Sequence, residues 1–94
     1  MNILDRLRYR EILISRLNRL SGYENHYDKD YMPIKGAMHL LCKNGKYRIM
    51  KQNGNIGKDV FSDHEPVSWF PTWLSLKKTV ELLEERIQLL EKDN

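Results

Sequence analysis

The chain has 94 residues, of which 31% are charged and 40% are hydrophobic, and its formal net charge is +3. A chain of this length forms one domain that buries a modest share of its surface, so association with further copies would add to its stability. No apolar run approaches the length of a membrane span and no basic leader precedes Asp5, so we expect a cytoplasmic protein without membrane contact. Cys42 is the only cysteine, which excludes an internal disulfide and a zinc site made of several thiolates.

The first predicted element is a helix over residues 3–20. Asn2, followed by Asp5, is typical of a helix N-cap, and Ser21-Gly22 is typical of a helix end. At 100° per residue, one arc of the helix is apolar and is expected to face the core: Ile3, Leu7, Leu13, Ile14, Leu17 and Leu20. Three arginines point away from this arc, and they are either a solvated face or a candidate surface for nucleic acid: Arg8, Arg16 and Arg19.

A tyrosine-rich connector over residues 21–35 leads into a strongly basic segment. Tyr23, Tyr27 and Tyr31 are spaced by four, a spacing that fits a helix face and a strand face equally well, and the connector is predicted as a loop. From residue 31 to 58 no carboxylate occurs, while six basic residues accumulate: Lys35, Lys43, Lys46, Arg48, Lys51 and Lys58. A basic stretch without acids predicts an anionic partner.

Two Asn-Gly dipeptides, at 44–45 and 53–54, predict the turns of a three-stranded antiparallel meander over residues 36–62, with a third strand at 56–61. With the first turn at 44–45, Lys43 pairs with Lys46 and His39 pairs with Met50. The face expected to join the core holds Met38, Leu40, Cys42, Tyr47 and Ile49. The other face holds His39, Leu41, Lys43, Lys46, Arg48 and Met50.

An acidic and aromatic loop over residues 63–72 precedes a long helix predicted over residues 73–92, with Thr72 or Ser75 as its cap. A three-four repeat along this helix predicts a seam between copies of the chain: Trp73, Leu76, Val80, Leu83, Ile87 and Leu90. A pair with the first helix within one chain is the alternative, and the two pairings do not exclude each other. The elements together predict an α+β domain.

The sequence contains no convincing catalytic constellation, so we expect a non-enzymatic protein with no catalytic residue, metal or cofactor. Two groups come nearest to a metal site, and solvated connectors are the favoured interpretation of both: His26 with Asp28 and Asp30, and Asp63-His64-Glu65.

Cations on the rigid hairpin and aromatic rings near it predict a site for a phosphate-bearing ligand. The candidate ligand-binding residues are His39, Lys43, Lys46, Arg48, Lys51, Trp69 and Tyr27. The alternative for the basic face is a charged, solvated surface that protects the sheet edge. Phe70 and Trp73 are expected to fix their loop onto the core.

The order of elements, the Pro-x-Lys-Gly entry at residues 33–36 and the Lys-Asn-Gly-Lys-Tyr turn at 43–47 resemble small uncharacterised proteins of Gram-positive bacteria and their phages. Short, oligomeric, cytosolic, non-catalytic chains are also similar in type to phage anti-defence proteins, including those that sequester nucleotide immune signals. The resemblance implies no role for any single residue.

Three hypotheses follow. In the first, a non-enzymatic homo-oligomer of the phage anti-defence type captures a nucleotide-like ligand. In the second, the hairpin and the arginines of the first helix bind nucleic acid, with an affinity that falls as salt rises. In the third, the chain inhibits a host enzyme or defence protein, and the long helix or the aromatic loop makes the contact.

Overall fold

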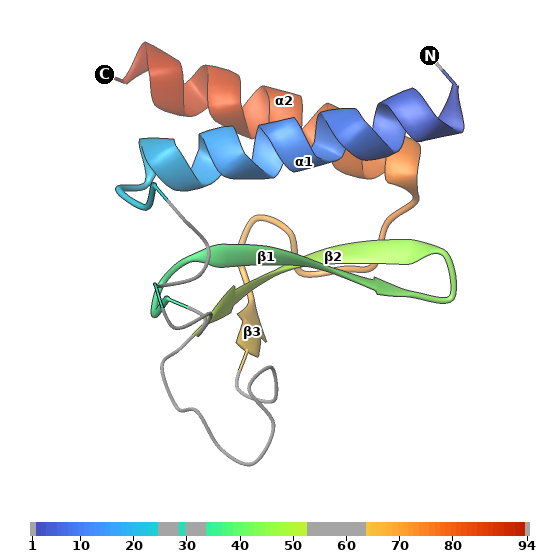
Figure 1. Ribbon diagram of the computed structural model, residues 1–94, viewed down its shortest axis with the longest axis horizontal. Helices are drawn as coiled ribbons and strands as arrows, with labels where there is room; N and C mark the ends of the chain where they lie inside the picture. The colour runs from blue at the N-terminus through green and yellow to red at the C-terminus, as the bar shows by residue number, and fades with distance from the viewer. Residues whose placement is uncertain (1, 25–28, 30–33, 53–63, 94) are drawn as a thin grey trace.

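The α+β architecture predicted from the sequence is confirmed by a computed structural model, which describes residues 2–24, 29, 34–52 and 64–93. Two helices lie side by side on one face of a three-stranded antiparallel sheet in the order β1-β2-β3 (Figure 1). The elements are α1 (Ile3–Leu20), β1 (Met38–Lys43), β2 (Lys46–Gln52), β3 (His64–Pro66) and α2 (Leu76–Lys92). Within the described part of the chain, neither helix combines the length and the apolar character that crossing a membrane requires.

Both ends of α1 lie where the sequence places them. The side chain of Asn2 accepts a hydrogen bond of 2.8 Å from the backbone N–H of Asp5, as an N-cap does. After Leu20 the backbone reverses at Gly22, whose φ is +95°. Ile3, predicted to face the core, is instead 68% exposed, because the first turn lies at the free end of the helix pair (Figure 1).

The β1-β2 hairpin has the predicted turn and register. Asn44 and Gly45 have φ values of +52° and +75°, the two positive values that a type I′ turn requires. Lys43 lies opposite Lys46, and the pairing continues along the strands as far as Met38. The Asn-Gly signal therefore sets which side chains of the hairpin face the helices.

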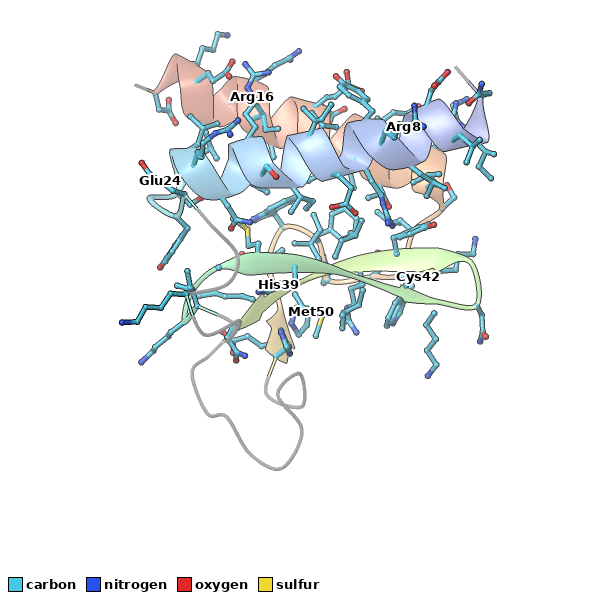
Figure 2. All side chains as sticks on the ribbon, viewed as in Figure 1. Arg8, Arg16, Glu24, His39, Cys42 and Met50 are labelled. Atoms are coloured by element: carbon cyan, nitrogen blue, oxygen red, sulfur yellow. The ribbon has the colours of Figure 1, made fainter. Side chains whose placement is uncertain are left out.

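Two hairpin side chains differ from expectation. Cys42, predicted on the core face, is exposed, because it lies toward the turn end of the hairpin, past the core (Figure 2). His39, predicted on the outer face, is only 7% exposed, and its ring packs edge-on against His64 at 5.6 Å between centroids. The outer face of the sheet is thus partly covered where β3 joins it.

The third strand differs from the predicted one. Residues 56–61, predicted as that strand, lie outside the described residues, whereas β3 lies in the segment predicted as an acidic loop. It pairs antiparallel with β2, from His64 opposite Gln52 to Pro66 opposite Met50. Proline cannot donate a backbone hydrogen bond, so it is tolerated in an edge strand of this kind.

The second helix begins at Leu76 rather than at residue 73, with Ser75 as its N-cap. Trp73 therefore lies before the helix and holds no heptad position, because the next residue, Leu74, forms a backbone bridge with Tyr47 of β2. Three seam residues are at most 6% exposed within a single chain: Val80, Leu83 and Ile87. They pack in the core shared with α1, the intramolecular alternative given above, and association with a second copy stays a prediction.

A buried asparagine joins α1 to the edge of the sheet. Asn18 is 0% exposed; its Nδ2 donates to the carbonyl oxygen of Met38 at 3.0 Å, and its Oδ1 accepts from the N–H of Met38 at 2.8 Å. Alternate residues of an antiparallel strand turn their backbone groups away from the neighbouring strand, and β1 has β2 on one side only. The amide of Asn18 therefore replaces one residue of a further strand.

We predict that Asn18→Ala lowers the free energy of unfolding by about 2–4 kcal/mol, because it leaves two buried backbone groups without partners, each costing about 1–3 kcal/mol. Urea denaturation measures the change. Asn2→Ala, which removes an exposed helix cap, is the control and should cost about 1 kcal/mol. Equal losses for the two variants would contradict the role assigned to Asn18.

Polar contacts between the helices predict a dependence of stability on alkaline pH. The Tyr9 hydroxyl donates to Oε2 of Glu84 at 3.3 Å, and burial, followed by the charge of Glu84, raises the pKa of Tyr9 above its ordinary value of 10.0. The unfolded chain then loses this proton first, so the stabilisation is complete below about pH 10 and is lost as pH rises through the raised pKa.

Tyr9→Phe should therefore reduce the fall in unfolding free energy between about pH 9 and pH 11, because phenylalanine has no proton to lose. Urea denaturation of both proteins across this range is the measurement. Parallel curves for the two proteins would show that Tyr9 does not contribute.

Candidate ligand-binding cleft

A cleft of about 600 Å³ lies between the helix pair and the end of the sheet at which β3 pairs with β2. Its apolar floor comes from four elements or loops: Leu17, Met38, Val67 and Leu90. Polar and aromatic side chains line it as well, among them Tyr23, Lys51, Glu65, Ser68, Trp69 and Arg86. Polar and apolar surface contribute about equally to its lining, and its volume lies within the range of about 300–1,000 Å³ that is common for small-molecule sites.

A second hollow of about 440 Å³ adjoins the cleft and adds Lys35 and Gln52 to its lining. The two hollows share four lining residues: Tyr23, Gly36, Lys51 and Glu65. Because a side chain that lines both hollows lies at their boundary, the two are adjacent parts of one depression.

A glycine lets the wall of this depression form. Gly36 has a φ of +88°, and its N–H donates to the carbonyl of Gln52 at 2.7 Å, while the N–H of Gln52 donates to Ala37 at 3.1 Å. Gly36 and Ala37 on one strand therefore both lie opposite Gln52 on the other, which is a β-bulge at the start of the hairpin. A Cβ at Gly36 would clash with the hydroxyl of Tyr23, so only glycine allows the tyrosine ring to pack this closely.

Two cations that line the cleft form no ion pair within the described part of the chain. Lys51 lies directly opposite Glu65 across the β2-β3 ladder, yet neither forms an ion pair with another described residue. The guanidinium of Arg86 lies 5.3 Å from the centre of the Trp69 ring, and Arg86 likewise has no ion pair in the described part of the chain. Among the described residues, therefore, no carboxylate occupies the N–H donors of these two cations.

The stack of Arg86 on Trp69 is supported from the core. The Trp69 ring meets Phe70 edge-on, with centroids 5.8 Å apart and an interplanar angle of 89°. Phe70 is 1% exposed, as expected for a residue that fixes its loop onto the core. The guanidinium is therefore held against a positioned ring, which reduces the conformational freedom that it would lose on binding a ligand.

Of the seven predicted ligand-binding residues, the structure places Lys51 and Trp69 in the cleft. Tyr27 lies outside the described residues. The strand alternation places the other four on the opposite face of the sheet from Lys51: His39, Lys43, Lys46 and Arg48. The predicted set is therefore divided between two faces.

Arg48, on that opposite face, is held by contacts within the chain. Its Nη2 donates to the carbonyl oxygen of Pro71, and its guanidinium lies 5.8 Å from the centre of the Trp73 ring. Lys43 and Lys46, by contrast, are exposed on either side of the turn. The anion-binding capacity of this face therefore lies in the two lysines.

The arginines predicted to contact nucleic acid, which lie on α1, join neither the cations of the cleft nor the lysines at the hairpin turn. Arg8 and Arg16 project from α1 (Figure 2), and Arg16 forms an ion pair with Glu91 of α2. Arg8 and Arg19 are exposed on the side of α1 opposite its buried face, whereas Lys43 and Lys46 point away from both helices. The two basic elements thus lie on opposite sides of the domain.

The predicted set omits Arg86, Glu65 and Lys35, which line the depression. Arg86 has the pattern of a solvated position flanking the apolar repeat of a helix, and only the folded chain brings it to Trp69, 17 positions earlier. Glu65 belongs to the segment interpreted as a solvated connector. The strand pairing that places it opposite Lys51 has no local signal in the sequence.

Among the described residues, no group of three or more His, Cys, Asp or Glu side chains is placed to hold a metal ion. Four residues of the candidate metal groups lie outside the described part: His26, Asp28, Asp30 and Asp63. No protein-family model, curated protein or solved structure matches this chain. The resemblance to phage proteins therefore stays a prediction.

The stack of Arg86 on Trp69 can be tested by fluorescence in a Trp73→Phe background, where Trp69 is the only tryptophan. Arg86→Ala should increase the quenching of Trp69 by acrylamide and lower the free energy of unfolding by about 0.5–1 kcal/mol, the usual contribution of a cation–π contact. Arg48→Ala, made in the same background, should leave the quenching unchanged. Unchanged quenching in Arg86→Ala would contradict the stack.

Proposed function

We propose that the protein is a non-enzymatic binding protein that captures a phosphate-bearing, nucleotide-like ligand in the cleft. The main support is the convergence of Lys51 and Arg86, two cations that form no ion pair within the described part of the chain, on a hollow with an apolar floor. A nucleotide presents an anionic phosphate and a flat, partly apolar ring, and the cleft offers a surface for each.

The cations suit phosphate for different reasons. Arg86 presents a planar fork of donors that matches two oxygens of one phosphate, and the Trp69 ring limits its movement. Lys51 is a compact charge on the central strand of the sheet, whose pairing with β1 on one side and β3 on the other fixes the position of its backbone. Hydrogen bonds to charged groups contribute about 1.5–3 kcal/mol each, enough for two cations to dominate the affinity for a small anion.

The floor and the aromatic wall suit the rest of a nucleotide. Leu17, Met38 and Leu90 provide apolar surface on which a ring loses contact with water. Tyr23 offers a ring and a hydroxyl at the boundary with the second hollow. Capture without turnover is the role that the resemblance to phage anti-defence proteins implies, and a shared site between two copies stays part of that prediction.

The test is isothermal titration calorimetry with the 5′-monophosphates of adenosine, guanosine, cytidine and uridine. We expect at least one to bind, and we expect Lys51→Ala and Arg86→Ala each to weaken its binding by about tenfold or more. Lys77→Ala, which removes the same charge from an exposed site in the first turn of α2, should leave the affinity unchanged. Binding that is insensitive to Lys51 and Arg86 would contradict a site in the cleft.

A nucleic-acid-binding surface at the hairpin turn is the second candidate, favoured by the exposed pair of Lys43 and Lys46 directly across the turn. This hypothesis expects binding of an oligonucleotide that weakens steeply with salt and is lost in a Lys43→Ala, Lys46→Ala double variant. Oligonucleotide binding that keeps its strength in this variant would exclude the turn as the site.

A further inference from the structure

We infer that the two adjoining hollows form one groove and that the captured ligand is a nucleotide with a phosphate chain, a nucleoside diphosphate or triphosphate, whose distal phosphates contact Lys35. This inference rests on the proposed function and narrows its ligand class. The four lining residues shared by the cleft and the second hollow place the two volumes side by side, with Lys51 at their boundary.

Three cations follow one another along this groove. Arg86 lines only the larger hollow, Lys51 lines both hollows, and Lys35 lines only the smaller one. None of the three forms an ion pair with a described residue. A single phosphate can reach the cations of one hollow, either Arg86 with Lys51 or Lys51 with Lys35, whereas a chain of phosphates can extend from Arg86 past Lys51 to Lys35.

The backbone fixes the base of the Lys35 side chain. The N–H of Ala37 donates to the carbonyl of Ile34 at 3.1 Å, which closes a turn with Lys35 and Gly36 as its central residues. The φ of Gly36 is +88°, whereas the φ of Lys35 is not positive. This combination is typical of a type II turn. Because Gly36 is also hydrogen-bonded to Gln52, the neighbour of Lys51, the turn holds Lys35 beside the end of β2.

Glu65 limits where the phosphates can lie. It lines both hollows opposite Lys51, and its negative charge repels phosphate oxygens on its side of the groove. Its carboxylate accepts hydrogen bonds, so it suits ribose hydroxyls or a base amino group rather than a phosphate. Among the described residues that line the groove, the three cations still outnumber this one carboxylate, an excess that matches a ligand carrying more than one negative phosphate.

The experiment titrates AMP, ADP and ATP, and the corresponding phosphates of guanosine, cytidine and uridine, into the protein without divalent metal and at fixed ionic strength. We expect affinity to rise by about tenfold or more from monophosphate to triphosphate of the preferred base. Lys35→Ala should abolish this rise and leave the affinity for the monophosphate within about twofold of that of the unaltered protein. The control, Lys77→Ala, should show the same rise as the unaltered protein. Lys35→Arg should restore most of the rise, which a purely structural role of Lys35 would not explain.

The outcomes separate this inference from the proposed function. Equal affinity for mono- and triphosphates, with binding that still depends on Lys51, would overturn the inference that the ligand carries a phosphate chain. It would leave the proposal of nucleotide capture intact. An equal loss of affinity for the monophosphate and the triphosphate in Lys35→Ala would also overturn the inference of a phosphate chain. Failure of every nucleotide to bind the unaltered protein would overturn nucleotide capture itself.

Discussion

The structure depends most on the pair of hydrogen bonds between the Asn18 side chain and the backbone of Met38. Asn18 also ends its own helix, because its carbonyl accepts the N–H of Tyr23 at 2.8 Å after the chain reverses at Gly22. One residue thus fixes the distance between α1 and the sheet edge as well as the direction in which the chain leaves the helix. That direction brings Tyr23 onto Gly36, so the wall of the cleft follows from the same contact.

The cleft exists because the core ends before the sheet does. Ile49 is fully buried beneath the helices, whereas Lys51, two residues further on the same face of β2, is exposed and lines the cleft. The short strand β3 extends the sheet beside Lys51, and the loop that follows it carries Trp69 to the side of α2. The two helices leave this end of the sheet uncovered, and the uncovered end becomes the hollow.

Local chemistry determined the features that could be predicted from the sequence. The cap at Asn2, the end at Gly22 and the turn at Asn44-Gly45 each depend on residues within a few positions, so the bounds of α1 and the hairpin register were predictable. The strand β3 was not, because a three-residue strand containing proline has no pattern of its own and forms only where β2 offers its free edge. The start of α2 was missed for a similar reason, since the bridge between Leu74 and Tyr47 keeps Trp73 out of a helix that its spacing favours.

The difference between local and distant contacts also explains why the basic residues that are close in the sequence do not form one surface. The basic residues of the hairpin are close along the chain, but the period of two in a strand sends Lys51 to the helix face and Lys46 and Arg48 to the other. Arg48 is then held by Pro71 and Trp73, while Lys51 gains a distant neighbour, Arg86, that belongs to another element. A run of like charges therefore predicts an anionic partner, but the site for that anion is made by the cations that the fold brings together. In this chain Arg86, Lys51 and Lys35 line the uncovered end of the sheet, so the proposed groove ligand uses these cations, whereas a polyanion on the hairpin turn would use Lys43 and Lys46.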